Sequence, residues 1–250
     1  MIVDAHCHIG PAYAPAGLPP TGPKEVVKTI DENGIDIAVI SQLTKDYKED
    51  IEQVANAVRE YPTRIVGFAH INPHCQDACR ELDRAVNDLG LKGVKVHPAL
   101  DGFAIHDEIM YPIVERARDL KVPILTHAGW AGIGCGCLFA QPLELLYLAE
   151  LYPDVCMIMG HMGGDENYWP SAIKAAKKAD NIILDTSAFC IPHVIQRAAR
   201  DVGAERMIFG SDFPWTFQRL ELQKIRMLNL TEREKDMILG KNMLRILKME

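Results

Sequence analysis

Residues 91–127, LKGVKVHPALDGFAIHDEIMYPIVERARDLKVPILTH, contain the pattern that decides the fold. Short runs rich in β-branched residues at 91–97 and 122–127 enclose a longer stretch at 106–120, whose apolar residues recur at helical spacing. Two strands joined through a helix run parallel, because the crossover returns the chain to the same end of the sheet. The stretch therefore predicts a strand, helix and strand of a parallel α/β fold.

The same alternation extends over the rest of the chain. Further strand-like runs lie at 2–6, 35–41, 64–71, 155–161, 181–187 and 206–212, which makes eight, and helical patterns fall between them. Eight such units in 250 residues have the size at which a parallel sheet closes into a (β/α)₈ TIM barrel. We expect one domain over 1–250, with a C-terminal helical extension from Thr231 onward. An open doubly wound sheet is the alternative, but its glycine-rich phosphate-binding motif is missing after the first strand.

The composition narrows the class of protein. With 48% hydrophobic and 24% charged residues, the chain is neither disordered nor of low complexity. A net charge of −7 without a basic stripe argues against a nucleic-acid partner. No run approaches the roughly 18 apolar residues that cross a bilayer, so we expect no membrane partner. The odd count of seven cysteines and a start without a secretory pattern lead us to expect a cytoplasmic protein with reduced thiols.

Side chains that bind metals or move protons follow the predicted strands. These are His6, His8, His97, His127, His161 and Asp212. In a barrel the carboxyl ends of all strands meet at one face, where the active site is built. His6 and His8 are two residues apart, so on a strand both imidazoles point the same way. With His127 and Asp212 they offer three imidazoles and a carboxylate, which suit one Zn²⁺ ion and also accept Mn²⁺, Fe²⁺ or Co²⁺.

The motifs around these residues resemble those of the amidohydrolase superfamily. They are VDAHCH at 3–8, GVKVHP at 93–98, THAG at 126–129, GHMGG at 160–164 and GSDFPW at 210–215, in that order. The short branch that includes aminocarboxymuconate-semialdehyde decarboxylase and related metal-dependent hydrolases is the most similar. The resemblance implies that His6, His8, His127 and Asp212 hold the metal, with His161 facing the metal-bound water.

The resemblance also draws attention to Lys95. This lysine stands where binuclear relatives carry a carboxylated lysine that bridges two metals. An unmodified ammonium would be repelled by a divalent cation, which argues against a second metal next to this lysine. We expect one metal, with Lys95 either holding a substrate carboxylate or forming an ion pair inside the barrel with a residue such as Asp4.

Two reactions fit this set of residues. As a metal-dependent hydrolase, the protein would use a metal-activated water on a small amide, ester or lactone, which can itself be carboxylated. Asp212 would take the proton of the attacking water, and His161 would stabilise the oxyanion or move that proton. The alternative is a non-oxidative decarboxylase, in which Lys95 orients the substrate carboxylate and His161 or the metal-bound water protonates the carbanion. The sequence leaves both open.

The remaining candidates surround the predicted site. Trp130 and Trp215 directly follow two of the motifs, so we expect them to bind the small-molecule substrate through their aromatic faces. Cys135 and Cys137 are interpreted as loop thiols, and Cys7 should point away from the metal because side chains alternate along a strand. A homodimer is a possible assembly.

Overall fold

The computed structural model describes residues 1–11, 20–129, 139–164 and 167–250. Eight parallel strands form one sheet in which each strand pairs with the next along the chain. They are β1 (Val3–Ile9), β2 (Ile37–Gln42), β3 (Ile65–His70), β4 (Gly93–Val96), β5 (Ile124–Thr126), β6 (Met157–Met159), β7 (Ile182–Asp185) and β8 (Met207–Ile208).

Backbone hydrogen bonds bring the two edges of this sheet together. The amide of Ala5 donates to the carbonyl of Phe209 at 2.9 Å, and that of His8 donates to the carbonyl of Phe213 at 2.7 Å. These bonds place the segment after β8 alongside β1. The (β/α)₈ barrel expected from the sequence is confirmed.

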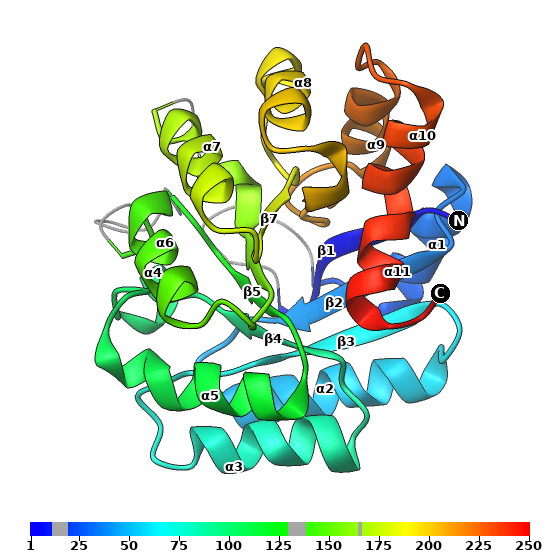
Figure 1. The fold of residues 1–250 in the computed structure, drawn as a ribbon. Helices are drawn as coiled ribbons and strands as arrows, with labels where there is room; N and C mark the ends of the chain where they lie inside the picture. The colour runs from blue at the N-terminus through cyan, green and yellow to red at the C-terminus, as the bar shows by residue number, and fades with distance from the viewer. Residues whose placement is uncertain (12–19, 130–138, 165–166) are drawn as a thin grey trace.

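Helices cover the outside of the barrel (Figure 1). They are α1 (Pro23–Asn33), α2 (Tyr47–Glu60), α3 (Ala78–Asp83), α4 (Pro98–Asp101), α5 (Tyr111–Leu120), α6 (Pro142–Leu151), α7 (Trp169–Lys178), α8 (Pro192–Asp201), α9 (Gln218–Arg226), α10 (Glu232–Asp236) and α11 (Asn242–Leu247). A π-helical turn at Arg84–Asp88 extends α3, and another at Met237–Lys241 joins α10 to α11. None of the helices in the described ranges is long and apolar enough to cross a membrane.

The barrel interior is a separate apolar cluster. Phe68 fills it from β3, and Gly93 on the neighbouring β4 leaves the necessary room, since a Cβ there would lie 2.5 Å from the Phe68 ring. Met243 and Leu247 of α11 join the same cluster. The expected C-terminal helices are therefore confirmed, and the last of them contacts β1 and β8.

Some predicted strands were too long. The run 206–212 forms a strand only at Met207–Ile208, because the chain then leaves the ladder and Asp212 adopts a left-handed conformation with φ of 64°. By contrast, β1 continues past the predicted 2–6 to Ile9, so His6 and His8 both lie on the strand itself.

Candidate metal and catalytic site

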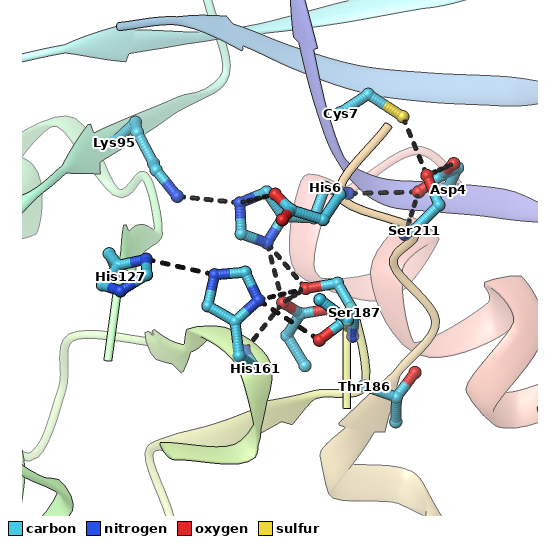
Figure 2. Close-up of polar contacts among 12 residues, drawn as sticks. Asp4, His6, Cys7, Lys95, His127, His161, Thr186, Ser187 and Ser211 are labelled. Carbon is cyan, nitrogen blue, oxygen red and sulfur yellow. Dashed lines mark hydrogen bonds and ion pairs between the residues drawn. The ribbon is translucent and has the colours of Figure 1, made fainter. Parts of the chain in front are cut away.

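The predicted site residues meet at the carboxyl ends of the strands. His6 and His8 lie on β1, Lys95 on β4, and His97 and His127 directly follow β4 and β5. His161 lies in the 3₁₀ turn Gly160–Gly163 after β6, and Asp212 lies beyond β8. All these histidines are buried, and Figure 2 shows Lys95, His127 and His161 gathered around His6.

Hydrogen bonds fix the protons of two of the histidines. Nδ1 of His161 lies 3.2 Å from the carbonyl oxygen of Ser187, which can only accept, so this nitrogen carries a proton. Nε2 of His161 then accepts from Nδ1 of His127 at 3.1 Å. A lone pair is left on Nε2 of His127, and this buried atom has no hydrogen-bond partner among the described residues.

An unpaired buried nitrogen of this kind is costly unless something binds it. A neutral imidazole lone pair is the group with which histidine binds metal ions. Nε2 of His127 therefore fits a metal cation in the barrel mouth.

The opposite side of the site offers further donors. Nδ1 of His6 lies 2.8 Å from the Asp185 carboxylate, which directs Nε2 toward the site. Oδ1 of Asp212 lies 3.7 Å from that Nε2 and 3.1 Å from Nε2 of His8. Ligands of one ion with bonds of about 2.0–2.2 Å lie roughly 3.0–3.5 Å apart, so these separations are close to those of a shared metal.

The tightest group of donors differs from the predicted ligand set. Among the described residues, one ligand atom each from His6, His161 and Asp212 lie within 4.8 Å of one another. His8 contacts Asp212, and His127 contacts His161, so all five side chains adjoin. The assignment of His6, His8, His127 and Asp212 as ligands stays a prediction, and His161 is as close to His6 and Asp212 as a ligand could be.

Burial sets the charges in this cluster. Loss of water, together with the nearby charge of Lys95, lowers the pKa of His6 to about 3. Burial likewise lowers the pKa of His8 and His127. Burial alone would raise the pKa of Asp212, but His161 and the hydrogen bond with His8 outweigh it and hold that pKa below its usual value. The site thus combines neutral imidazoles with an ionised carboxylate, the forms that bind metals.

Lys95 is a buried cation with few partners. Its Nζ lies 2.8 Å from Nε2 of His6, and no carboxylate of the described residues lies within ion-pair distance of it. Burial lowers its pKa to about 8, so the ammonium is still charged at neutral pH. The ion pair with Asp4, one of the two roles expected for Lys95, is not formed.

Asp4 instead holds the segment that presents Asp212. Its carboxylate accepts hydrogen bonds from the amide of Ser211 at 2.8 Å, the Ser211 hydroxyl at 2.6 Å and the amide group of Gln218 at 2.9 Å. Asp4 and Ser211 lie on the far side of β1 from Lys95 (Figure 2). Through these hydrogen bonds Asp4 fixes the turn in which Asp212 adopts a left-handed conformation.

The sequence reasoning missed two residues at the end of β7. Asp185 contacts His6, and the Ser187 hydroxyl lies 3.0 Å from Nδ1 of His6 and 2.9 Å from Nδ1 of His161 (Figure 2). Both residues fall at the carboxyl end of the predicted strand 181–187. That position was the one available signal, since functional groups of a barrel collect there.

The other predicted residues have mixed outcomes. Trp215 lies beyond β8 with 43% of its surface exposed, and its place in a substrate pocket stays a prediction. Trp130, Cys135 and Cys137 lie outside the described residues. Cys7 is buried with its sulfur 3.6 Å from the Ser211 hydroxyl, so it points away from the cluster, as predicted.

Several known proteins are similar to this chain in sequence or fold. The chain is 25% identical to a gamma-resorcylate decarboxylase of Polaromonas sp., over 76% of each protein. The chain is also 27% identical to 2-amino-3-carboxymuconate-6-semialdehyde decarboxylase of Dictyostelium discoideum over 84 residues. This stretch covers 33% of this chain and 23% of that protein. A dihydroxybenzoic acid decarboxylase of Polaromonas sp., solved with manganese and the inhibitor 2-nitroresorcinol, has the same fold. Its TM-score is 0.78 at 20% identity, over 99% of this chain and 97% of that one.

A family model covers almost the entire sequence. The model described as amidohydrolase matches residues 3–249, which include every candidate site residue. The enzyme therefore belongs to the amidohydrolase family.

Proposed function

We propose that this protein is a metal-dependent decarboxylase of a small carboxylate, in which an oxygen substituent lies next to the carboxyl group. The observation that carries the proposal is the buried ammonium of Lys95, which faces the histidine cluster without a carboxylate partner among the described residues. A substrate carboxylate would supply the missing counter-charge. The relatives named above, which are decarboxylases, support this reaction over hydrolysis.

The charges of the site favour an anionic ligand. A divalent ion and Lys95 would bring three positive charges, against two negative charges on Asp185 and Asp212. The resulting excess of positive charge, in a buried site where charges are weakly screened, attracts an anion.

His6, His8, His127 and Asp212 would hold the metal. Imidazole and carboxylate ligands suit Mn²⁺ as well as Zn²⁺, and the manganese of the similar decarboxylase makes both candidates here. When bound, the metal supplies Lewis-acid stabilisation of negative charge on the substrate oxygens.

Lys95 would orient the substrate, and His161 would transfer the proton. Lys95 pairs with the carboxylate and orients the bond that breaks. When this bond breaks, CO₂ leaves, and the electron pair that stays on carbon takes a proton from His161, whose Nε2 has first taken that proton from solvent. The Ser187 carbonyl and hydroxyl hold the other nitrogen of His161, which keeps the ring in place for this transfer. One proton is consumed for each CO₂ released, and solvent restores it.

Hydrolysis of a small amide, ester or lactone is the second candidate. It is favoured by Asp212, whose lowered pKa keeps the carboxylate ready to accept a proton from water. Product analysis separates the two reactions, because only decarboxylation releases CO₂ without adding water to the substrate.

The test uses protein loaded with Mn²⁺ or Zn²⁺. We expect CO₂ release from 2,6-dihydroxybenzoate or a related ring carboxylate and no opening of esters or lactones. Lys95→Met should weaken substrate binding strongly, whereas the same change at the exposed Lys92 should have no effect. Turnover of an ester or lactone with no CO₂ from any ring carboxylate would establish hydrolysis instead.

A further inference from the structure

His97 lies in the site but has no part in the reaction described above. It directly follows β4, two residues after Lys95, and is buried with 8% of its surface exposed. Its ring stacks on that of His127, with centroids 4.2 Å apart and an angle of 10° between the planes. His97 is therefore fixed beside His127, a predicted metal ligand.

The backbone after β4 decides where the proton of His97 sits. Nδ1 of His97 accepts a hydrogen bond from the amide of Leu100 at 3.2 Å, and so caps α4. A ring nitrogen that accepts carries no proton, so the proton of the neutral ring is on Nε2. No described residue accepts a hydrogen bond from this Nε2. The site thus contains an N–H donor with no protein partner in the described part of the chain.

The short helix that fixes this tautomer is itself anchored. Asp101, the last residue of α4, lies 3.0 Å from Nε2 of His70 on β3. Nδ1 of His70 lies 2.9 Å from Asp50 of α2. These three buried side chains tie α4 to the body of the barrel, so the donor of His97 is held in place before any ligand binds.

We infer that Nε2 of His97 donates a hydrogen bond to an anionic oxygen of the substrate, a role that rests on the decarboxylase function proposed above. Lys95 lies on β4, and His97 follows two residues later with φ of −133°, close to that of a strand, so the two side chains project to the same side. Lys95 supplies charge, and His97 supplies a directed neutral donor. Losing a hydrogen bond to a charged group of this kind should weaken binding by about 10- to 100-fold.

Two substitutions separate the two nitrogens of His97. In His97→Asn the amide oxygen can take the place of Nδ1 as the cap of α4, but nothing reaches the position of Nε2. In His97→Gln the amide nitrogen can reach the position of Nε2, but the cap is lost. If His97 has only a structural role, ligand affinity should be retained in His97→Asn and reduced in His97→Gln. If His97 binds the substrate, ligand affinity should be reduced in His97→Asn and retained in His97→Gln.

The probe is 2-nitroresorcinol, whose dissociation constant is measured by calorimetry on the manganese-loaded protein. We expect His97→Asn to keep the melting temperature but bind the probe about 10- to 100-fold more weakly, and His97→Gln to bind within a few-fold of the unmodified protein. Equal affinities of His97→Asn and unmodified protein would overturn the inference, as would failure of the unmodified protein to bind the probe.

A spectroscopic measurement checks the tautomer directly. In protein labelled with ¹⁵N-histidine, the His97 signals, assigned by their loss in His97→Gln, should show a proton on Nε2 and none on Nδ1. A proton on Nδ1 would overturn the inference even if CO₂ release is found. If the tautomer is as described but no ring carboxylate loses CO₂, the proposed decarboxylation fails and the inference falls with it.

Discussion

The imidazole of His6 on β1 lies 2.8 Å from the carboxylate of Asp185 on β7, a contact between residues 179 positions apart. The carboxylate can only accept, so Nδ1 of His6 carries the proton and Nε2 presents its lone pair to the site. A carboxylate behind a metal-binding histidine fixes the ring and raises its basicity. The contact thus prepares His6 for a cation.

Asp185→Asn should therefore weaken metal binding. The asparagine oxygen can still accept from His6 but lacks the charge, so we expect a loss of affinity of about 10-fold, at the lower end of the effect of such partners. Competition with a chelator measures the change. Asp180→Asn is the control, because this fully exposed carboxylate precedes β7 at its opposite end. Unchanged affinity in Asp185→Asn would contradict the proposed role of His6.

His127→Ala should remove the metal. Its Nε2 is the buried atom without a partner in the described residues, and its loss deletes one of the four predicted ligands. Elemental analysis should find about one divalent ion per chain in the unmodified protein, and much less in the variant. His74→Ala, at an exposed histidine, should retain the full content. Retention of the metal by His127→Ala would show that the ligand set is wrong.

His161→Ala should separate metal binding from the reaction. If His161 moves the proton, its loss should lower kcat by about 10²- to 10⁴-fold while the metal content stays near one per chain. The two quantities are measured on the same preparation. A variant that loses its metal in proportion to its activity would make His161 a ligand instead, as its place within 4.8 Å of His6 and Asp212 allows.

Lys95→Met should weaken substrate binding without lowering the stability of the protein. Binding of the substrate carboxylate should weaken by about 10- to 100-fold, seen as a higher KM, because a charge-assisted hydrogen bond is lost. The melting temperature should stay the same or rise, since a buried charge without a carboxylate partner is replaced by an apolar chain of similar length. A lower melting temperature with unchanged KM would assign Lys95 to the structure of the barrel alone.

Stability should depend on Glu221 between pH 5 and 8. This residue of α9 accepts from the amide of Ala188 at 3.0 Å, and burial raises its pKa to about 7 from 4.5. The folded protein therefore holds the proton more tightly than the unfolded chain. The contribution to stability is complete below about pH 4.5 and is lost as the pH rises through about 7.

Glu221→Gln should flatten this dependence. Urea unfolding of the unmodified protein should show a free energy that falls from pH 5 to pH 8 by on the order of 2–3 kcal/mol more than in the variant. Glu232→Gln, at an exposed glutamate of α10, should follow the unmodified protein. Parallel curves for Glu221→Gln and the unmodified protein would contradict the raised pKa.

The barrel was predictable because local patterns repeat. Each strand and helix has its own periodicity. His8 and His127 were found because each lies next to the end of a strand, and His6 because it lies two residues before His8 on the same strand. The length of β8 was not predictable, since the backbone of Asp212 turns left-handed through contacts with β1. Nothing in the local sequence of 206–212 indicates that turn.

The supporting residues were harder to predict for the same reason. The contact of Asp4 with Ser211 spans 207 positions, and that of Ser187 with His6 spans 181. No spacing rule links residues so far apart in the sequence. Lys95 was recognised by its motif, but the absence of its expected contact with Asp4 follows from the two residues lying on different sides of β1 (Figure 2).

The most direct test of the account is the fate of the substrate carbon in D₂O. Manganese-loaded protein is incubated with 2,6-dihydroxybenzoate, and the product is analysed by mass spectrometry and NMR. Decarboxylation predicts CO₂ together with resorcinol that carries one deuterium at the carbon that lost the carboxylate. Absence of CO₂ and of deuterium from this and related ring carboxylates, with ¹⁸O from labelled water appearing in a hydrolysed ester or lactone, would contradict it.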